Sequence, residues 1–136
     1  SAFYSPTVFN YYSPEYKIPG TTLLGPEFNL MTTGTAIARA NFSNTMVYSN
    51  LAASQPNTPV GTRFNYAEMQ ALALADPTSN QLLDALDQKM MHGTMSASMR
   101  NTILTAVNSI AAANTLQRAQ QAVYLVATSS QYQIQR

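Results

Sequence analysis

Apolar residues between Asp76 and the end of the chain recur at every third or fourth position, and this spacing restricts the fold most. An α-helix places such residues on one face, so the pattern predicts three amphipathic helices. The short breaks between them make consecutive helices antiparallel neighbours in a bundle. The expected inward-facing residues are Leu82, Leu83, Leu86 and Met90, then Met99, Ile103, Val107 and Ile110, and finally Leu116, Ala119, Val123 and either Val126 or Ala127.

The expected ends of these three helices rest on capping residues. Asp76 followed by Pro77 predicts an N-cap and a proline in the first helical position. Gly93 suits the left-handed conformation that ends many helices. Ser96 is the expected N-cap of the second helix, and Asn114 or Thr115 that of the third, because their side chains accept hydrogen bonds from free backbone amides.

Two further helices are expected upstream. From about Thr33 the pattern becomes helical, with Ala36, Ile37, Ala40, Met46 and Val47 roughly on one side. A loop over residues 54–65 follows, because two prolines and a glycine block regular structure there. A short helix then begins near Asn65, which with Glu68 resembles a capping box.

The first 26 residues differ from the rest because they contain four prolines and six of the thirteen aromatic residues. Proline removes a backbone donor, so this arm is expected to be irregular. The predicted architecture is all-α, with an arm over residues 1–26 and a bundle of four or five helices over residues 27–136. The aromatic side chains either pack onto the bundle, form a seam to a missing part of a longer protein, or line a shallow site. The candidate ligand or partner surface comprises Tyr4, Phe9, Tyr11, Tyr12 and Tyr16.

The composition excludes several classes of function. The formal net charge is +1 and only 10% of residues are charged, so no basic surface for nucleic acid is expected. The absence of cysteine excludes disulfides, thiolate nucleophiles and cysteine metal sites. No apolar run has the length of about 18 residues that indicates a membrane span. The glycines are too isolated for a phosphate loop, and no cofactor motif is present.

The residues able to support catalysis are few. His92, the single histidine, is expected to cap the end of the leucine-rich helix, where the helix dipole favours a cation. Asp84 and Asp87 lie on the same helix as His92, but their spacings from His92 do not place the three side chains on one face. This argues against a metal site formed by these residues. Glu15 and Glu27 are the carboxylates without an evident structural role. No catalytic, cofactor or metal residue is therefore assigned.

Several separated motifs resemble a known bacterial family. They are "PTVFNYYSPEYKIPG", "GPEFNL", "HGTMS" and "AVYLVATSSQYQIQR", in that order. Together they are similar to the C-terminal region of the domain of unknown function 1800 (DUF1800) family. The resemblance covers essentially the whole chain. Two departures are Ser130, where members usually have proline, and Tyr11, where phenylalanine is commoner.

The resemblance implies an exported bacterial parent protein, located in the periplasm, at the cell surface or outside the cell, and no known reaction. We therefore expect a helical module with a structural or interaction role, whose partner is the remainder of the parent chain, another exported protein or a glycan. The alternative is a carbohydrate- or peptide-binding module that uses the N-terminal aromatic residues. A weaker alternative is part of a hydrolase completed by upstream residues.

Overall fold

The computed structural model describes Glu15, Lys17, Gly20, Thr22, residues 33–52 and residues 61–133. The chain divides into two compact units, Ser1–Ala38 and Arg39–Arg136, and the boundary falls inside the first helix. The expected domain boundary after residue 26 lies outside the described residues and stays a prediction.

The fold is all-α, which confirms the expected class. The helices are α1 (Thr33–Tyr48), α2 (Ala67–Ala75), α3 (Asn80–Leu86), the π-helical segment η2 (Asp87–Met91), α4 (Ala97–Asn108), α5 (Thr115–Thr128) and α6 (Ser130–Gln133). Within residues 33–52 and 61–133, extended pairing is limited to the isolated antiparallel bridge between Leu51 and Thr62.

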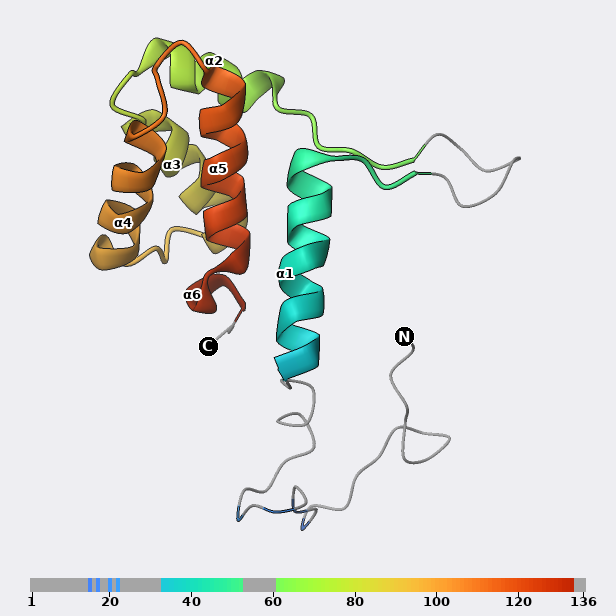
Figure 1. Ribbon diagram of the computed structural model, residues 1–136. Coiled ribbons are helices and arrows are strands. Elements are labelled where there is room, and N and C mark those ends of the chain that lie inside the picture. Colours follow the sequence, from blue (N-terminus) through green and yellow to red (C-terminus); the bar gives the residue numbers. More distant parts are fainter. Residues whose placement is uncertain are drawn as a thin grey trace. The chain divides into compact units, whose positions relative to one another are not determined.

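Helices α2 to α5 form the bundle, and α5 contacts each of the other three (Figure 1). Helices α4 and α5 run antiparallel, as the short connection over residues 109–114 predicts. Helix α2 crosses the bundle at the end where α5 begins. This end carries the site described below.

The core of the bundle comes from the predicted apolar positions. Leu82, Leu83, Leu86, Val107 and Val126 have no exposed surface. Burying a side chain of this size contributes about 1.5–3 kcal/mol to the free energy of unfolding. The remaining buried apolar residues are Val47, Tyr66, Ala73, Met91, Ile103, Ala119, Ala122 and Val123.

The leucine-rich helix departs from prediction in its last turn. Met90 was expected inside, yet Met91 is the buried residue and Met90 is half-buried. The π-helical segment adds a residue to the turn, because its hydrogen bonds span five residues. The core spacing therefore changes from four residues, Leu82 to Leu86, to five residues, Leu86 to Met91. Gly93 adopts φ 78°, which confirms it as a left-handed cap, and its N–H donates to the Asp87 carbonyl.

The predicted start of this helix at Pro77 is wrong by three residues. Helix α3 begins at Asn80, and the N-cap position is taken by Ser79 in a left-handed conformation. The Asp76 carboxylate instead accepts from the Thr78 backbone and hydroxyl and from the Gln81 amide. Asp76 thus accepts a hydrogen bond from the Gln81 amide in the first turn of α3, although it does not occupy the N-cap position. The hydrogen bond from the Thr78 side chain is the main reason that the pKa of Asp76 is lowered.

The predicted capping box at the start of α2 is also wrong. Asn65 Oδ1 accepts from the Ala67 amide at 3.0 Å, but Glu68 forms an ion pair with Lys89 instead of reaching back to Asn65. Glu68 therefore pairs with Lys89 of the π-helical segment rather than with the backbone at the start of its own helix. The Ser96 N-cap is confirmed, because its hydroxyl accepts from the Met99 amide.

The connection after α1 is closed by a glycine. The Leu51 amide donates to the Thr62 carbonyl at 2.9 Å. A Cβ atom at Gly61 would lie only 1.6 Å from the Leu51 carbonyl oxygen, so this approach of two backbones requires glycine.

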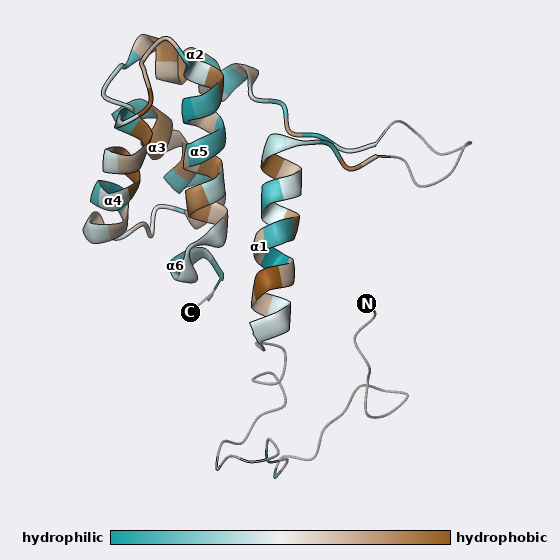
Figure 2. Ribbon diagram, viewed as in Figure 1, coloured by the Kyte–Doolittle hydropathy of each residue, from teal (hydrophilic) through white to brown (hydrophobic). Residues whose placement is uncertain are grey.

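Helix α1 is present as predicted, but its expected inner face is not buried as a stripe. Val47 is its only buried residue, whereas 57% of Ile37 is exposed. Apolar residues occur on several sides of α1, and on the side that Figure 2 presents they are interrupted by hydrophilic residues. A single stripe is what a half-buried helix needs, and α1 lacks one.

Candidate functional site

The aromatic surface predicted at the N-terminus, which comprises Tyr4, Phe9, Tyr11, Tyr12 and Tyr16, lies outside the described residues. The three interpretations of that surface therefore stay predictions. Glu15 is exposed in a turn and has an interaction partner. Glu27 also lies outside the described residues.

The polar residues of the leucine-rich helix have structural partners. Asp84 pairs with Arg100 at 2.7 Å, and Asp87 Oδ1 accepts from the Met95 amide at 3.0 Å. His92 ends the helix through its backbone, in a left-handed conformation with φ 54°, and its exposed imidazole bonds to no described residue. The part of the chain that the structure describes contains no group of three or more His, Asp or Glu side chains able to hold a metal ion.

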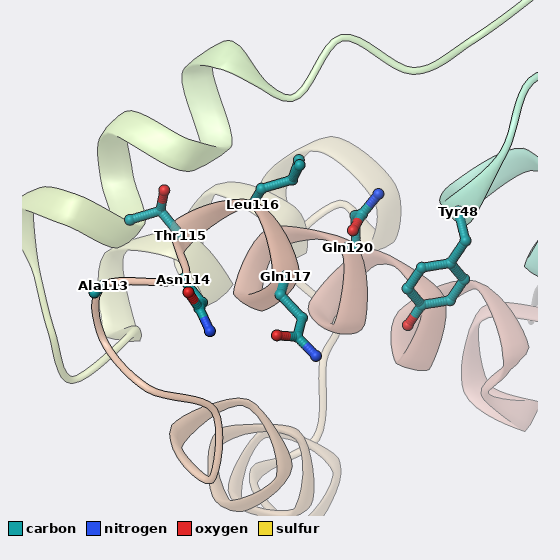
Figure 3. A pocket seen from close by; sticks show the side chains of 7 residues that line it. All are labelled: Tyr48, Ala113, Asn114, Thr115, Leu116, Gln117 and Gln120. Atoms are coloured by element: carbon teal, nitrogen blue, oxygen red, sulfur yellow. The ribbon is translucent and has the colours of Figure 1, made fainter.

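A shallow hollow of about 540 Å³ lies where α5 begins. Its lining contains one aromatic ring, one leucine and four uncharged polar side chains, and no charged residue. Figure 3 shows Asn114 and Gln117 extending to the same side of the helix, as their spacing of three residues requires. The lining residues are Tyr48, Ala113, Asn114, Thr115, Leu116, Gln117 and Gln120.

The ring of Tyr48 is held in place although 40% of the residue is exposed. Its hydroxyl donates to Gln121 Oε1 at 2.7 Å, and its ring packs at a tilt against Tyr124, with centroids 5.8 Å apart. Burial of the hydroxyl, with a smaller contribution from Tyr124, raises the pKa of Tyr48. The phenol therefore stays protonated and donates over the neutral range.

The backbone beside Tyr48 is fixed by two further contacts. The Val47 carbonyl accepts from the Tyr66 hydroxyl at 3.0 Å and from Gln120 Nε2 at 3.2 Å. Burial is also the main reason that the pKa of Tyr66 is raised to about 12. These contacts attach the end of α1 to α5 and place the Tyr48 ring at the edge of the hollow.

Three polar side chains in the hollow retain their hydrogen-bonding capacity. Asn114 occupies the N-cap position of α5, yet its side chain makes no capping hydrogen bond. Among residues 33–52 and 61–133, the side chains of Thr115 and Gln117 have no hydrogen-bond partner either. Each carboxamide offers a donor and an acceptor, and the hydroxyl offers both.

Sequence reasoning did not find this site and assigned Leu116 to the core. Leu116 is 44% exposed and lines the hollow instead of packing into the core. The sequence does contain a pattern that could have indicated this site. A second stripe, of polar residues and a tyrosine at helical spacing, runs beside the apolar one and comprises Asn114, Gln117, Gln121 and Tyr124. The contact of Tyr48 with that stripe spans 73 residues of sequence, which no local pattern reveals.

Arg118 is a second residue that the sequence analysis missed. It is 4% exposed and lies in the first turns of α5. Its guanidinium donates to the carbonyls of Ile110 and Pro77 and to the hydroxyl of Ser79. A buried cation held by neutral acceptors joins the loops before α3 and α5, so Arg118 sets the position of the first turn of α5.

The family model described as "Protein of unknown function (DUF1800)" matches residues 1–134. The chain belongs to the DUF1800 family. No curated protein and no solved structure matches it. The DUF1800 assignment confirms the resemblance of the separated motifs and brings no reaction with it.

No helix in the described part of this DUF1800 chain is long and apolar enough to cross a membrane.

Proposed function

We propose that this DUF1800 chain is a helical interaction module rather than a catalyst. The observation that carries the proposal is the exposure of large apolar side chains on α1, above all Phe42, which is 58% exposed. A helix that bears apolar side chains all round is normally covered on more than one side. Helix α1 contacts the bundle through Val47 and Tyr48, and Phe42 lies outside these contacts.

The carboxylates of the bundle support a structural role. Glu68 and Asp84 are paired with Lys89 and Arg100, and Asp76 organises the start of α3. General acid–base chemistry needs carboxylates within reach of one substrate. These groups serve separate helix ends and helix contacts instead.

The partner that we propose is an uncharged, apolar surface in the remainder of the parent protein. Helix α1 contains one residue that is charged at neutral pH, Arg39, among threonine, asparagine and apolar side chains. A partner recognised by charge would need more charged residues on α1 than this. Burying a phenylalanine side chain contributes about 1.5–3 kcal/mol to the free energy of binding. We also propose that the parent is exported, which the low lysine content and the many neutral polar residues support.

Amide hydrogen exchange over residues 33–48 tests the interaction role when it is measured in this chain and in the longer parent protein. We expect the α1 amides to exchange at least about tenfold more slowly in the parent. Phe42→Ser should remove that added protection. Asn44→Ser is the matched control, because serine has a helix propensity similar to both original residues.

Two results would contradict the proposal. Equal protection of α1 in both proteins would show that no part of the parent covers it. Sedimentation that reveals a dimer of this chain, lost in Phe42→Ser, would assign the exposed surface to a second copy instead. Periplasmic or surface location of the parent is tested separately, by fractionation of the cells that produce it.

A further inference from the structure

We propose that the hollow at the start of α5 binds an uncharged oligosaccharide, with the ring of Tyr48 as a stacking wall and the side chains of Asn114 and Gln117 as hydrogen-bonding groups. This site goes beyond the interaction role of α1. It requires neither Phe42 nor a protein partner, so either proposal can fail while the other holds.

The size and openness of the hollow suit part of an extended ligand. Its volume of about 540 Å³ falls within the range of about 300–1,000 Å³ typical of small-molecule sites. It is open to solvent on one side, so a chain of sugar rings can enter and continue beyond it. An enclosed cavity would admit only a small, compact molecule.

Tyr48 provides a rigid aromatic surface. The hydrogen bond to Gln121 and the tilted contact with Tyr124 fix the ring before any ligand arrives. An apolar ring face packs against the C–H face of a sugar, and a ring that is already fixed loses little conformational entropy on binding. Leu116 adds a second apolar surface in the same hollow.

The carboxamides match the hydroxyl groups of a sugar. A carboxamide donates with its NH₂ group and accepts with its oxygen, so it can bond two neighbouring hydroxyls at once. Asn114 and Gln117 lie on the same side of α5 and have no partner among the described residues (Figure 3). Thr115 and Gln120 also line the hollow, and Figure 3 shows them extending to the other side of the helix.

The lining disfavours other classes of ligand. Phosphorylated and acidic ligands are usually held by arginine or lysine, and neither lines the hollow. An amphipathic helix needs a predominantly apolar groove, and a peptide that binds by strand addition needs an open strand edge. The hollow is lined by two large apolar side chains, Tyr48 and Leu116, and by the carboxamides of Asn114, Gln117 and Gln120. This lining favours a neutral ligand rich in hydroxyl groups.

Heteronuclear NMR titration of this chain with cello-, malto- and manno-oligosaccharides tests the proposal. We expect saturable shifts at the backbone amides of Thr115 and Gln117 and at the side-chain NH₂ of Asn114. Gln117→Ala should weaken binding at least about tenfold, or about 1.4 kcal/mol. Gln81→Ala is the control, because Gln81 is exposed on α3 outside the hollow.

A second variant separates stacking from folding. Tyr48→Phe retains the ring and should keep the affinity within about threefold of the original, whereas Tyr48→Ala should abolish binding while far-ultraviolet circular dichroism remains helical. Absence of saturable shifts in α5 up to about 10 mM of each neutral oligosaccharide would overturn the proposal. Shifts confined to residues 1–26, or shifts produced by a proline-rich peptide but by no sugar, would also overturn it.

Discussion

Helices α5 and α1 have similar lengths, 14 and 16 residues, but different surroundings. Helix α5 buries Arg118, Ala119, Ala122, Val123 and Val126, whereas α1 buries Val47 alone. The apolar residues of α5 recur on one stripe, and those of α1 are spread around the helix. Helix formation therefore does not determine burial, which follows the arrangement of apolar residues around the axis.

The comparison also separates two ways of holding a helix. Helix α5 is held along its length by apolar contact with α2, α3 and α4. Helix α1 is held near its C-terminal end, through hydrogen bonds of Val47 and Tyr48 with Tyr66, Gln120 and Gln121. Such polar contacts contribute about 1 kcal/mol each, much less than a buried apolar face.

The sharpest test of this difference compares Leu86→Ala with Phe42→Ala. Leu86 has no exposed surface, so its truncation should lower the free energy of unfolding by about 2–5 kcal/mol through the cavity it leaves. Phe42→Ala should change it by less than about 0.5 kcal/mol, because the ring already faces solvent. Urea denaturation measures both. Similar decreases in the free energy of unfolding in the two variants would contradict the proposed difference in burial between the bundle core and α1.

Arg118 is expected to give the next largest effect. Arg118→Met keeps much of the buried stem but leaves the carbonyls of Ile110 and Pro77 without a donor, at a cost of about 2–3 kcal/mol. Arg118→Lys should recover less than half of this, because an ammonium group cannot span the acceptors that a guanidinium reaches. Full stability of the lysine variant in urea denaturation would show that charge alone suffices.

Tyr66 tests the weaker attachment of α1. Its folded pKa of about 12 exceeds the ordinary value of 10.0, so the folded protein holds the proton after the unfolded chain has lost it. The stability that this supplies is complete below pH 10 and is lost as the pH rises from 10 to 12.

Tyr66→Phe removes both the titration and the hydrogen bond to Val47. We expect it to cost about 1 kcal/mol at neutral pH and to make the urea midpoint fall less steeply between pH 10 and 12. Tyr132→Phe is a control on an exposed tyrosine. If the urea midpoint of the Tyr66→Phe variant falls with pH as steeply as that of the original protein, burial of the Tyr66 hydroxyl does not contribute to stability.

Much of the bundle was predictable because its determinants are local. The apolar spacing identified Leu82, Leu83, Leu86, Ile103, Val107, Ala119 and Val123 as core residues, and the structure buries them. Of the two alternatives Val126 and Ala127, Val126 is the buried one. The left-handed cap at Gly93 and the N-cap at Ser96 were also predictable, because each cap involves residues within one or two turns.

Two of the errors arose where a distant partner or an extra residue changed a local pattern. Glu68 pairs with Lys89 rather than with the start of its own helix, and the π-helical turn moves Met91 into the place expected for Met90. The candidate site was missed for the same reason. Tyr48 and Gln121 are far apart in the sequence, and only the folded chain brings them together.

By itself, the sequence determined the all-α class, most of the bundle core and the family, because helical periodicity and separated motifs are written along the chain. Only the tertiary structure decided that Arg118 is buried, that Leu116 is exposed and that Tyr48 borders a neutral hollow. The physical reason is that burial depends on which helices surround a residue. That depends on contacts between residues distant in the chain.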